Sequence, residues 1–313
     1  MMTTEGFVYP SARSPAPVAV SGGGAEGPFD RSSGILLHPS SLPGPFGSGD
    51  FGDDARHFVD WLASAGQRLW QVLPMTPPGP GHSPYMSTSI HAGNPLLVSP
   101  VALQREGWLA QDALDAAMQR AGEPSPRIDF AAVERLRMSL LRQAAYAFFD
   151  DGKATVAQRQ AFAEWCALHA GWVEDYALFM ALAESPQGPR WSSWPELLRR
   201  REPQALLDAA RDHAPQMRFW RFVQWCFDRQ WQAIKHYANE RGVRLIGDVP
   251  IFCALDSVDV WVDPELFLLD ENLQPSFVAG VPPDYFSATG QLWGNPLYDW
   301  PRHAADGFRW WKT

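Results

Sequence analysis

The chain contains 313 residues, 46% of them hydrophobic and 19% charged, which suffices for one large domain or two and is not typical of a disordered protein. The formal net charge of −9 argues against a nucleic-acid-binding protein, which normally presents a basic face. No apolar run approaches the ~18 residues of a membrane span, and three scattered cysteines do not make a disulfide framework, so we expect a protein of the reducing cytoplasm.

The first hundred residues predict a leader and then a strand–helix–strand unit. Residues 1–30 have no hydrophobic periodicity and lack the basic start and apolar stretch of a signal peptide, so we expect a disordered leader. Apolar runs at 35–37 and 69–73 predict buried strands, and the amphipathic pattern over 53–65 predicts a helix between them. This order indicates a parallel sheet. A proline-rich loop over 74–100 then leaves the carboxyl end of the second strand, where α/β proteins build their sites.

The middle of the chain predicts helices. Residues 101–242 are too many for one crossover connection, so we expect an inserted helical subdomain. Asp129 is expected to cap one helix, and residues 193–196 have the pattern of a capping box. A long helix should run over about 216–241 and end at Gly242.

The C-terminal part predicts a third strand and a long irregular region. The strand should cover 243–252, with Asp248 near its carboxyl end. Residues 255–301 are rich in Asp, Pro and aromatic residues and are expected to form loops and short turns. Residues 308–313 have the pattern of the first turn of a helix.

Tryptophan is unusually frequent, with 15 residues in the chain. One interpretation is that these rings pack the core. The other is a surface that stacks flat apolar faces, such as those of sugar rings, beside polar groups that bind hydroxyls. The count alone favours neither.

Five segments of the chain resemble a known family. They are GILLHPSSLPG at 34–44, SPY at 83–85, AGNPL at 92–96, IGDVPIF at 246–252 and GVPPDYFSATGQLWGNP at 280–296. In content and order these segments closely resemble the amylomaltases, the 4-α-glucanotransferases of glycoside hydrolase family seventy-seven. The resemblance extends from about Gly34 to the last residue.

The resemblance implies an α/β fold of the (β/α)8 TIM-barrel type with a largely helical inserted subdomain. The implied organisation is a leader at 1–30, a first barrel part at 31–100, a helical insertion at 101–242, and the third barrel strand with a substrate-binding loop at 243–313. Only about three barrel strands would then lie in this chain. The implied substrates are α-1,4-glucans and malto-oligosaccharides. Eight histidines without ligand spacing argue against a catalytic metal, and we expect no cofactor.

The implied reaction is a retaining transfer of glucan segments to glucose or malto-oligosaccharide acceptors. One carboxylate attacks the anomeric carbon and a second carboxylic acid protonates the leaving oxygen, with the two carboxyls roughly 5–5.5 Å apart. A sugar hydroxyl then resolves the covalent intermediate.

The family's nucleophile lies in an Arg-Ile-Asp-His-Phe-Arg-Gly type of motif on the fourth strand, and this motif is absent. Residues 127–130 resemble its beginning, but they precede the third strand and are typical of a helix start, which argues against Asp129 as the nucleophile. We therefore expect the N-terminal half of an amylomaltase, with no catalytic residue in this chain and the catalytic carboxylates after Thr313. The alternative is a catalytically inactive glucan-binding fragment, and a hydrolase of the α-amylase type agrees less well with residues 284–296.

The resemblance assigns substrate binding to nine residues. They are His38, Ser83, Tyr85, Asp248, Asp284, Tyr285, Phe286, Trp293 and Asn295. The three residues from Asp284 to Phe286 match a mobile loop over the cleft, where an aromatic pair can stack on glucose and exclude water. Trp293 and Asn295 match positions near the scissile bond.

The remaining assignments concern strand ends. Tyr85, which follows Ser83 and a proline, matches a tyrosine that contacts sugar. Asp248 would orient the site electrostatically or bind a hydroxyl. His38 ends the first strand and is as much a candidate for the core as for the site. For each of the nine, the alternative is a packing or capping role.

Overall fold

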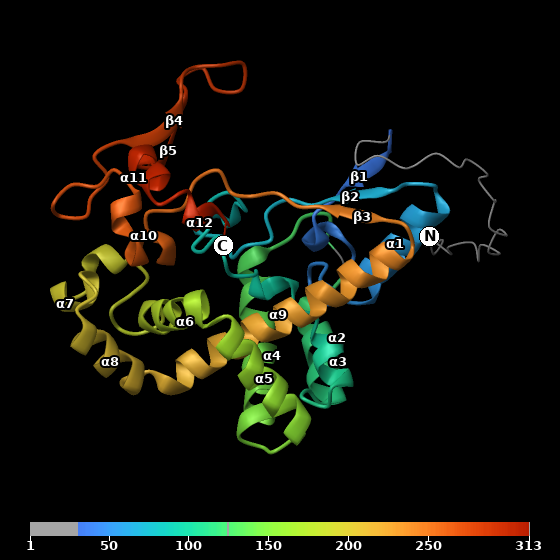
Figure 1. The fold of residues 1–313 in the computed structure, drawn as a ribbon. Helices are drawn as coiled ribbons and strands as arrows, with labels where there is room; N and C mark the ends of the chain where they lie inside the picture. Colours follow the sequence, from blue (N-terminus) through green and yellow to red (C-terminus); the bar gives the residue numbers. More distant parts are fainter. Residues whose placement is uncertain (1–30, 124, 313) are drawn as a thin grey trace, which may run out of the picture.

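A small parallel sheet lies on one side of the molecule (Figure 1). The computed structural model describes residues 31–123 and 125–312, so the leader expected at 1–30 lies outside the described residues. The strands, in spatial order, are β1 (Gly34–Leu36), β2 (Leu69–Gln71) and β3 (Arg244–Ile246). Both pairs are parallel, with Trp70 opposite Ile35 on one side and Leu245 on the other. The three predicted strands and their parallel pairing are confirmed.

Each strand has three residues and ends earlier than the sequence predicts. Prolines at 39, 74 and 250 lack the N–H that a further ladder bond needs. In the described part of the chain, β3 has a pairing partner on one side only. The prediction of a strand over 243–252 was therefore too long, and Asp248 follows β3 on an unpaired extended segment.

Helix α1 (Asp53–Ser64) connects β1 to β2 and covers one face of the sheet. Its apolar stripe includes Val59, which is fully buried in the same cluster as Trp70 of β2. The other face of the sheet is open, since Leu36 is 54% exposed and Ile246 is 41% exposed. The strand–helix–strand unit therefore forms as predicted, with one covered face.

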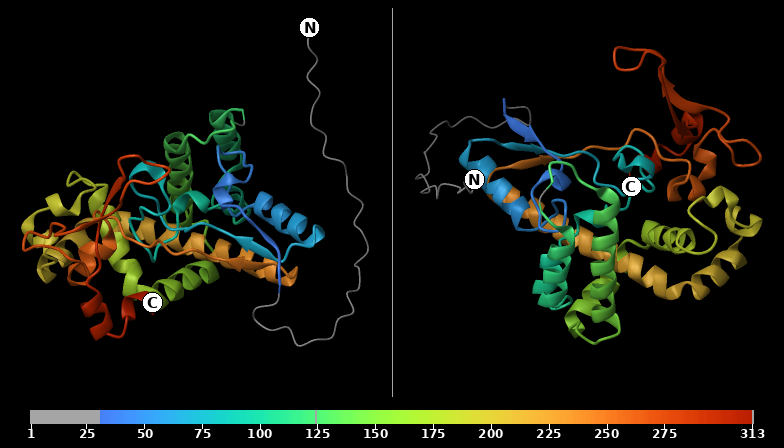
Figure 2. Two further views of the ribbon diagram at one scale, coloured as in Figure 1. Left: turned by 90° about the horizontal axis from the view of Figure 1, so that it is seen from above. Right: turned by 180° about the vertical axis from the view of Figure 1, so that it is seen from behind.

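The middle of the chain is helical, as predicted. Its helices are α2 (Pro100–Arg105), α3 (Gln111–Ala121), α4 (Phe130–Phe149), α5 (Val156–Leu168), α6 (Ala170–Ala183), α7 (Glu196–Arg199), α8 (Pro203–Asp212) and α9 (Ala214–Glu240). The long α9 contacts α6 near one end and α1 and β3 near the other, and the views in Figure 2 show it running between the helical part and the sheet. It links the two parts of the molecule.

The helix ends follow the sequence in two cases and depart from it in one. Asp129 caps α4, since its Oδ1 accepts a hydrogen bond from the Ala132 N–H at 3.0 Å. Gly242 follows α9 with a φ of 72°, the left-handed conformation that glycine adopts most easily. The capping box predicted at 193–196 was wrong: Pro195 precedes α7 without a side-chain cap, and the Ser193 hydroxyl donates backwards to a carbonyl.

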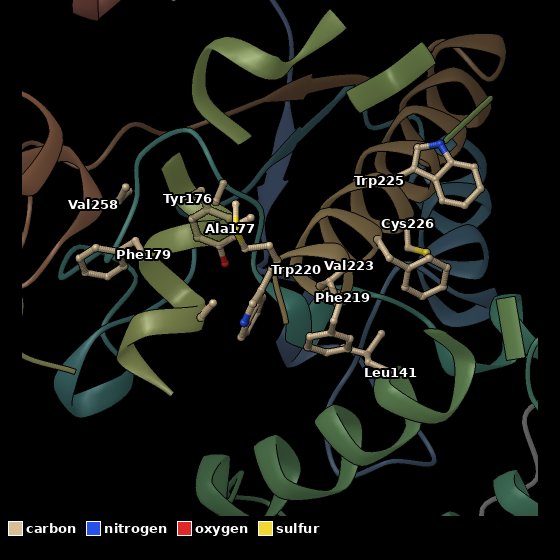
Figure 3. Close-up of a cluster of buried hydrophobic side chains, with 14 of the residues drawn as sticks. Leu141, Tyr176, Ala177, Phe179, Phe219, Trp220, Val223, Trp225, Cys226 and Val258 are labelled. Carbon is tan, nitrogen blue, oxygen red and sulfur yellow. The ribbon is translucent and has the colours of Figure 1, made fainter. Parts of the chain in front are cut away.

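Two apolar clusters form the core. The larger one joins the helices and includes Trp220 of α9 edge-to-face with Tyr176 of α6, near Phe219 and Val223 (Figure 3). The smaller one lies under the sheet around Trp70. Eight of the 15 tryptophans are buried: Trp70, Trp108, Trp191, Trp194, Trp220, Trp225, Trp261 and Trp310. Core packing therefore accounts for about half of the tryptophans.

The C-terminal region contains more regular structure than the sequence predicts. It forms α10 (Val258–Val262), β4 (Val278–Val281), β5 (Gln291–Pro296), α11 (Trp300–Ala305) and α12 (Arg309–Lys312). The antiparallel hairpin of β4 and β5 projects from the body of the molecule (Figure 1). The prediction of loops and short turns over 255–301 missed this hairpin, because prolines and glycines interrupt its sequence, whereas the helix expected near 308 is confirmed. In the part of the chain that the structure describes, none of the helices combines the length and the apolar character of a membrane span.

Candidate functional site

Two of the predicted site residues meet where β2 and β3 end. The Tyr85 hydroxyl donates a hydrogen bond to Oδ2 of Asp248 at 2.7 Å, although the residues are far apart in sequence. Both side chains are exposed. This bond to the carboxylate, more than the slight burial, raises the pKa of the Tyr85 phenol. The loop that follows β2 and the segment that follows β3 therefore bring a phenol and a carboxylate together, beyond the strand ends where α/β proteins commonly build their sites.

Local hydrogen bonds hold each partner of this pair. Oγ of Ser83 accepts from the Tyr85 N–H at 3.3 Å, and the Ser83 carbonyl accepts from the Met86 N–H at 3.1 Å. Asp248 also accepts, through Oδ1, from the Val249 N–H at 2.8 Å. Ser83 thus shapes the turn that presents Tyr85, while both oxygens of Asp248 have donors.

A buried junction connects this pair to the hairpin. Ser87 pairs with Cys253 in a parallel bridge, and the Asn295 side-chain amide of β5 donates to the Cys253 carbonyl at 2.8 Å. Cys253 is fully buried, which raises the pKa of its thiol, and Asn295 is only 2% exposed. The structure therefore places Asn295 beneath the surface, where its amide group joins two segments.

Trp293 lies next to this junction on the exposed side of β5. Its ring is 41% exposed and stands edge-to-face with Phe252, with the ring centroids 6.2 Å apart. The indole N–H donates to Oε1 of Gln291 at 3.2 Å. Phe252 follows Asp248 on the segment after β3, so this segment contacts Trp293 four residues beyond Asp248.

The turn between β4 and β5 carries the predicted aromatic pair. Oδ1 of Asp284 accepts from the backbone N–H groups of Phe286 and Ser287 at 2.9 and 2.8 Å, so this carboxylate shapes the turn. Tyr285 is 96% exposed and Phe286 is 88% exposed, and their rings are perpendicular with centroids 5.5 Å apart. Each ring therefore contacts the other and solvent.

His38 has a local role at the end of β1. Its Nδ1 accepts a hydrogen bond from the Ser40 N–H at 3.2 Å, so the His38 side chain caps a short 3-10 turn at Pro39–Ser41. The same nitrogen lies 2.8 Å from the Ser40 hydroxyl. Burial lowers the pKa of the imidazole, and an interaction with the Pro74 backbone opposes this effect in part. The hydrogen bonds to Ser40 support the core alternative for His38.

Sequence reasoning missed several residues of this surface. Val249 and Ile251 are 61% and 65% exposed on the segment after β3, and Phe252 and Gln291 support Trp293. Their apolar character favours a buried strand, and they are exposed because this segment does not pair with another strand. The Cys253 junction left no signal in the sequence, because its partners are distant in the chain. Among the described residues, no group of three His, Cys, Asp or Glu side chains is arranged to hold a metal ion.

Comparisons with known proteins agree on one family. A family model described as 4-alpha-glucanotransferase matches residues 37–313. The chain is 47% identical over 281 residues to the 4-alpha-glucanotransferase of Thermus thermophilus, covering 90% of this chain and 54% of that protein. It is 46% identical over 282 residues to the Synechocystis 4-alpha-glucanotransferase, covering 90% and 55%. The chain thus spans about half the length of the curated relatives it matches.

Solved structures give the same result for the fold. An amylomaltase from Streptococcus agalactiae in complex with acarbose superposes with a TM-score of 0.83 at 37% identity, covering 90% of this chain and 56% of that one. An amylomaltase from Corynebacterium glutamicum, at 20% identity and a TM-score of 0.68, shares the fold. These likenesses confirm the predicted fold class, an α/β fold of TIM-barrel type with part of its parallel strands and a largely helical insertion.

Proposed function

The chain belongs to the 4-alpha-glucanotransferase family, and on that premise we propose that it binds α-1,4-glucans and malto-oligosaccharides on the surface just described. Tyr85, Asp248 and Trp293 would contact the sugar directly, and Ser83 and Asn295 would hold them in place. This proposal assigns no sugar contact to His38, whose Nδ1 is bonded to Ser40.

The exposed aromatic pair at the tip of the hairpin is the observation that carries this proposal. Tyr285 and Phe286 are 96% and 88% exposed, whereas large apolar rings normally lie in the core. An aromatic face exposed on a projecting hairpin fits the apolar face of a glucose ring, and the Asp248 carboxylate can accept hydrogen bonds from sugar hydroxyls.

The same surface would serve a retaining transfer of glucan segments, known from the family as 4-α-glucanotransferase activity. Stacking on Tyr285 and Phe286 would shield the reacting carbon from water, so that a sugar hydroxyl, rather than water, accepts the glucan. The reaction needs two carboxyls roughly 5–5.5 Å apart, one as nucleophile and one as acid. We assign neither role to a residue of this chain, because Asp129 caps α4 and Asp248 is bonded to a phenol.

Binding of maltoheptaose to the purified chain tests this proposal. Replacing both Tyr285 and Phe286 by Ala should weaken binding at least about tenfold, or ~1.4 kcal/mol, in isothermal titration calorimetry. Tyr146→Ala removes another exposed ring, 63% exposed on α4, and should leave binding unchanged. Equal binding by the double variant and the wild type would refute the assignment of this surface.

We further propose the cytoplasm as the compartment of the protein. Its three cysteines are free thiols, and two of them, Cys226 and Cys253, are buried. Free thiols of this kind persist in a reducing compartment.

A further inference from the structure

A cavity lies next to the segment that carries Ser89 and His91. It has a volume of about 580 Å³ and is bounded by α6, α10, α11 and α12. Small-molecule sites typically have volumes of ~300–1,000 Å³. None of the nine predicted site residues lines it.

The inner wall of this cavity is apolar and aromatic. Val258 and Leu266 are buried in the wall, and the indole rings of Trp172 and Trp310 contribute to it. His91 also lies in the wall, with its ring edge-to-face against Trp310 at a centroid distance of 6.1 Å. Indole rings beside aliphatic side chains can contact the apolar face of a ligand.

Polar groups of both signs line the rest of the cavity. The carboxylates belong to Asp175, Asp259, Asp263, Glu265 and Asp306, and the guanidinium groups to Arg302 and Arg309. Asp175 is paired with Arg201 at 2.6 Å, and burial raises the pKa of Asp259 to about 7, so this carboxyl is only partly ionised at neutral pH. Three further carboxylates face two guanidinium groups, so the cavity carries a small negative charge, which does not favour an anionic ligand.

We propose that this cavity binds a small neutral polyhydroxylated molecule, namely glucose or a short malto-oligosaccharide. A hydroxyl group both donates and accepts, so a polyol can bind the carboxylates of Asp263 and Glu265 and the guanidinium of Arg302 at the same time. The indole rings supply the apolar contact that a sugar ring also needs. The choice of a glucan-derived sugar rests on the proposed function, whereas the polyol chemistry follows from the cavity.

The cavity is connected to the candidate site through one segment. Ser89 and His91 line it, and they follow Tyr85 closely in the chain. Oδ2 of Asp259 accepts from the Ile90 N–H at 3.1 Å, and Ser87 pairs with Cys253 at the junction. A sugar in the cavity would therefore contact the loop that presents Tyr85.

Nuclear magnetic resonance of the indole N–H groups tests this proposal on the full chain. Trp172 and Trp310 report on the cavity and Trp293 on the candidate site, with the three signals assigned from Trp→Phe variants. Titration with maltose should shift the Trp172 and Trp310 signals saturably. Ala305→Trp fills the cavity from α11 and should weaken this response at least tenfold, whereas Ala304→Trp, an exposed neighbour that does not line the cavity, should not.

The outcomes separate the two proposals. Shifts at Trp293 alone would overturn the cavity site and leave the proposed function intact. Shifts at Trp172 and Trp310 that Ala305→Trp abolishes, with equal melting temperatures for both alanine variants, would support the cavity site even if Trp293 did not respond. Shifts caused by putrescine and not by maltose would also overturn the proposal, because the cavity would then select a cation.

Discussion

The bond between Tyr85 and Asp248 is the most specific contact in the candidate site. A phenol that donates to a carboxylate loses this bond when it ionises, so its pKa is raised. The sequence predicted both residues but not their contact, because only the sheet brings the ends of β2 and β3 together.

Replacing Asp248 by Asn should therefore lower the pKa of Tyr85 toward its ordinary value of about 10. The measurement is the ultraviolet titration of tyrosinate, with Tyr85→Phe used to isolate the contribution of this phenol. In the Tyr85→Phe background, Asp248→Asn should leave the remaining titration unchanged. A Tyr85 titration that does not respond would show that the two side chains are apart in solution.

Because Asp259 is buried, we expect the free energy of unfolding of the protein to depend on pH. Burial raises the pKa of its carboxyl from 3.8 to about 7, so the folded protein holds this proton more tightly than the unfolded chain. The contribution of this group to stability is thus fully present below about pH 4 and is lost as the pH rises through about 7.

Asp259→Asn cannot ionise, so the variant should gain stability relative to the wild type as the pH rises from 5 to 8. Melting temperatures at both pH values measure this difference, with Asp115→Asn on the surface of α3 as the control. Because Nε2 of His91 lies 4.0 Å from Oδ1 of Asp259, the proteins are compared in a His91→Gln background, which removes the titrating imidazole. If the melting temperatures of Asp259→Asn and the wild type differ by the same amount at both pH values, the pKa of the buried carboxyl is not raised.

At the scale of elements, the hairpin depends on its junction with the segment after β3. Asn295→Ala would leave the buried Cys253 carbonyl without its donor, which should cost about 1–3 kcal/mol of unfolding free energy. Denaturant unfolding measures the loss, and hydrogen exchange should increase in β4 and β5. Asn272→Ala, at an exposed turn, should change neither quantity.

The sequence predicted elements where a local pattern determines them. The α1 stripe, the Asp129 cap and the glycine after α9 all depend on neighbours in the chain, and all three are confirmed. The strand ends, the hairpin of β4 and β5 and the Cys253 junction depend on pairing between distant segments. The same holds for the candidate site. Motifs in the sequence identify its residues, but they do not show how far each side chain is buried, as for Asn295.

At the scale of the whole molecule, we expect the purified chain alone to release no glucose from maltotriose. Loss of a covalent nucleophile and its acid partner removes many orders of magnitude of rate, and no carboxyl of this chain is assigned to either role. The assay is glucose release, compared with Asp129→Ala. Release by the wild-type chain would contradict this expectation, and equal release by Asp129→Ala would show that Asp129 is not the source of the activity.

Helix α9 has 27 residues and a length of about 40 Å, and it is shared by both cores. Its first part carries Trp220 into the large cluster, Ile234 lies in the small one, and Phe227 packs against both. If one cluster unfolded while the other stayed folded, α9 would have to break in its middle and lose hydrogen bonds there. The described chain should therefore melt as one cooperative unit in calorimetry. A substitution that destabilises the helical part would then also lower the stability of the sheet that presents Asp248.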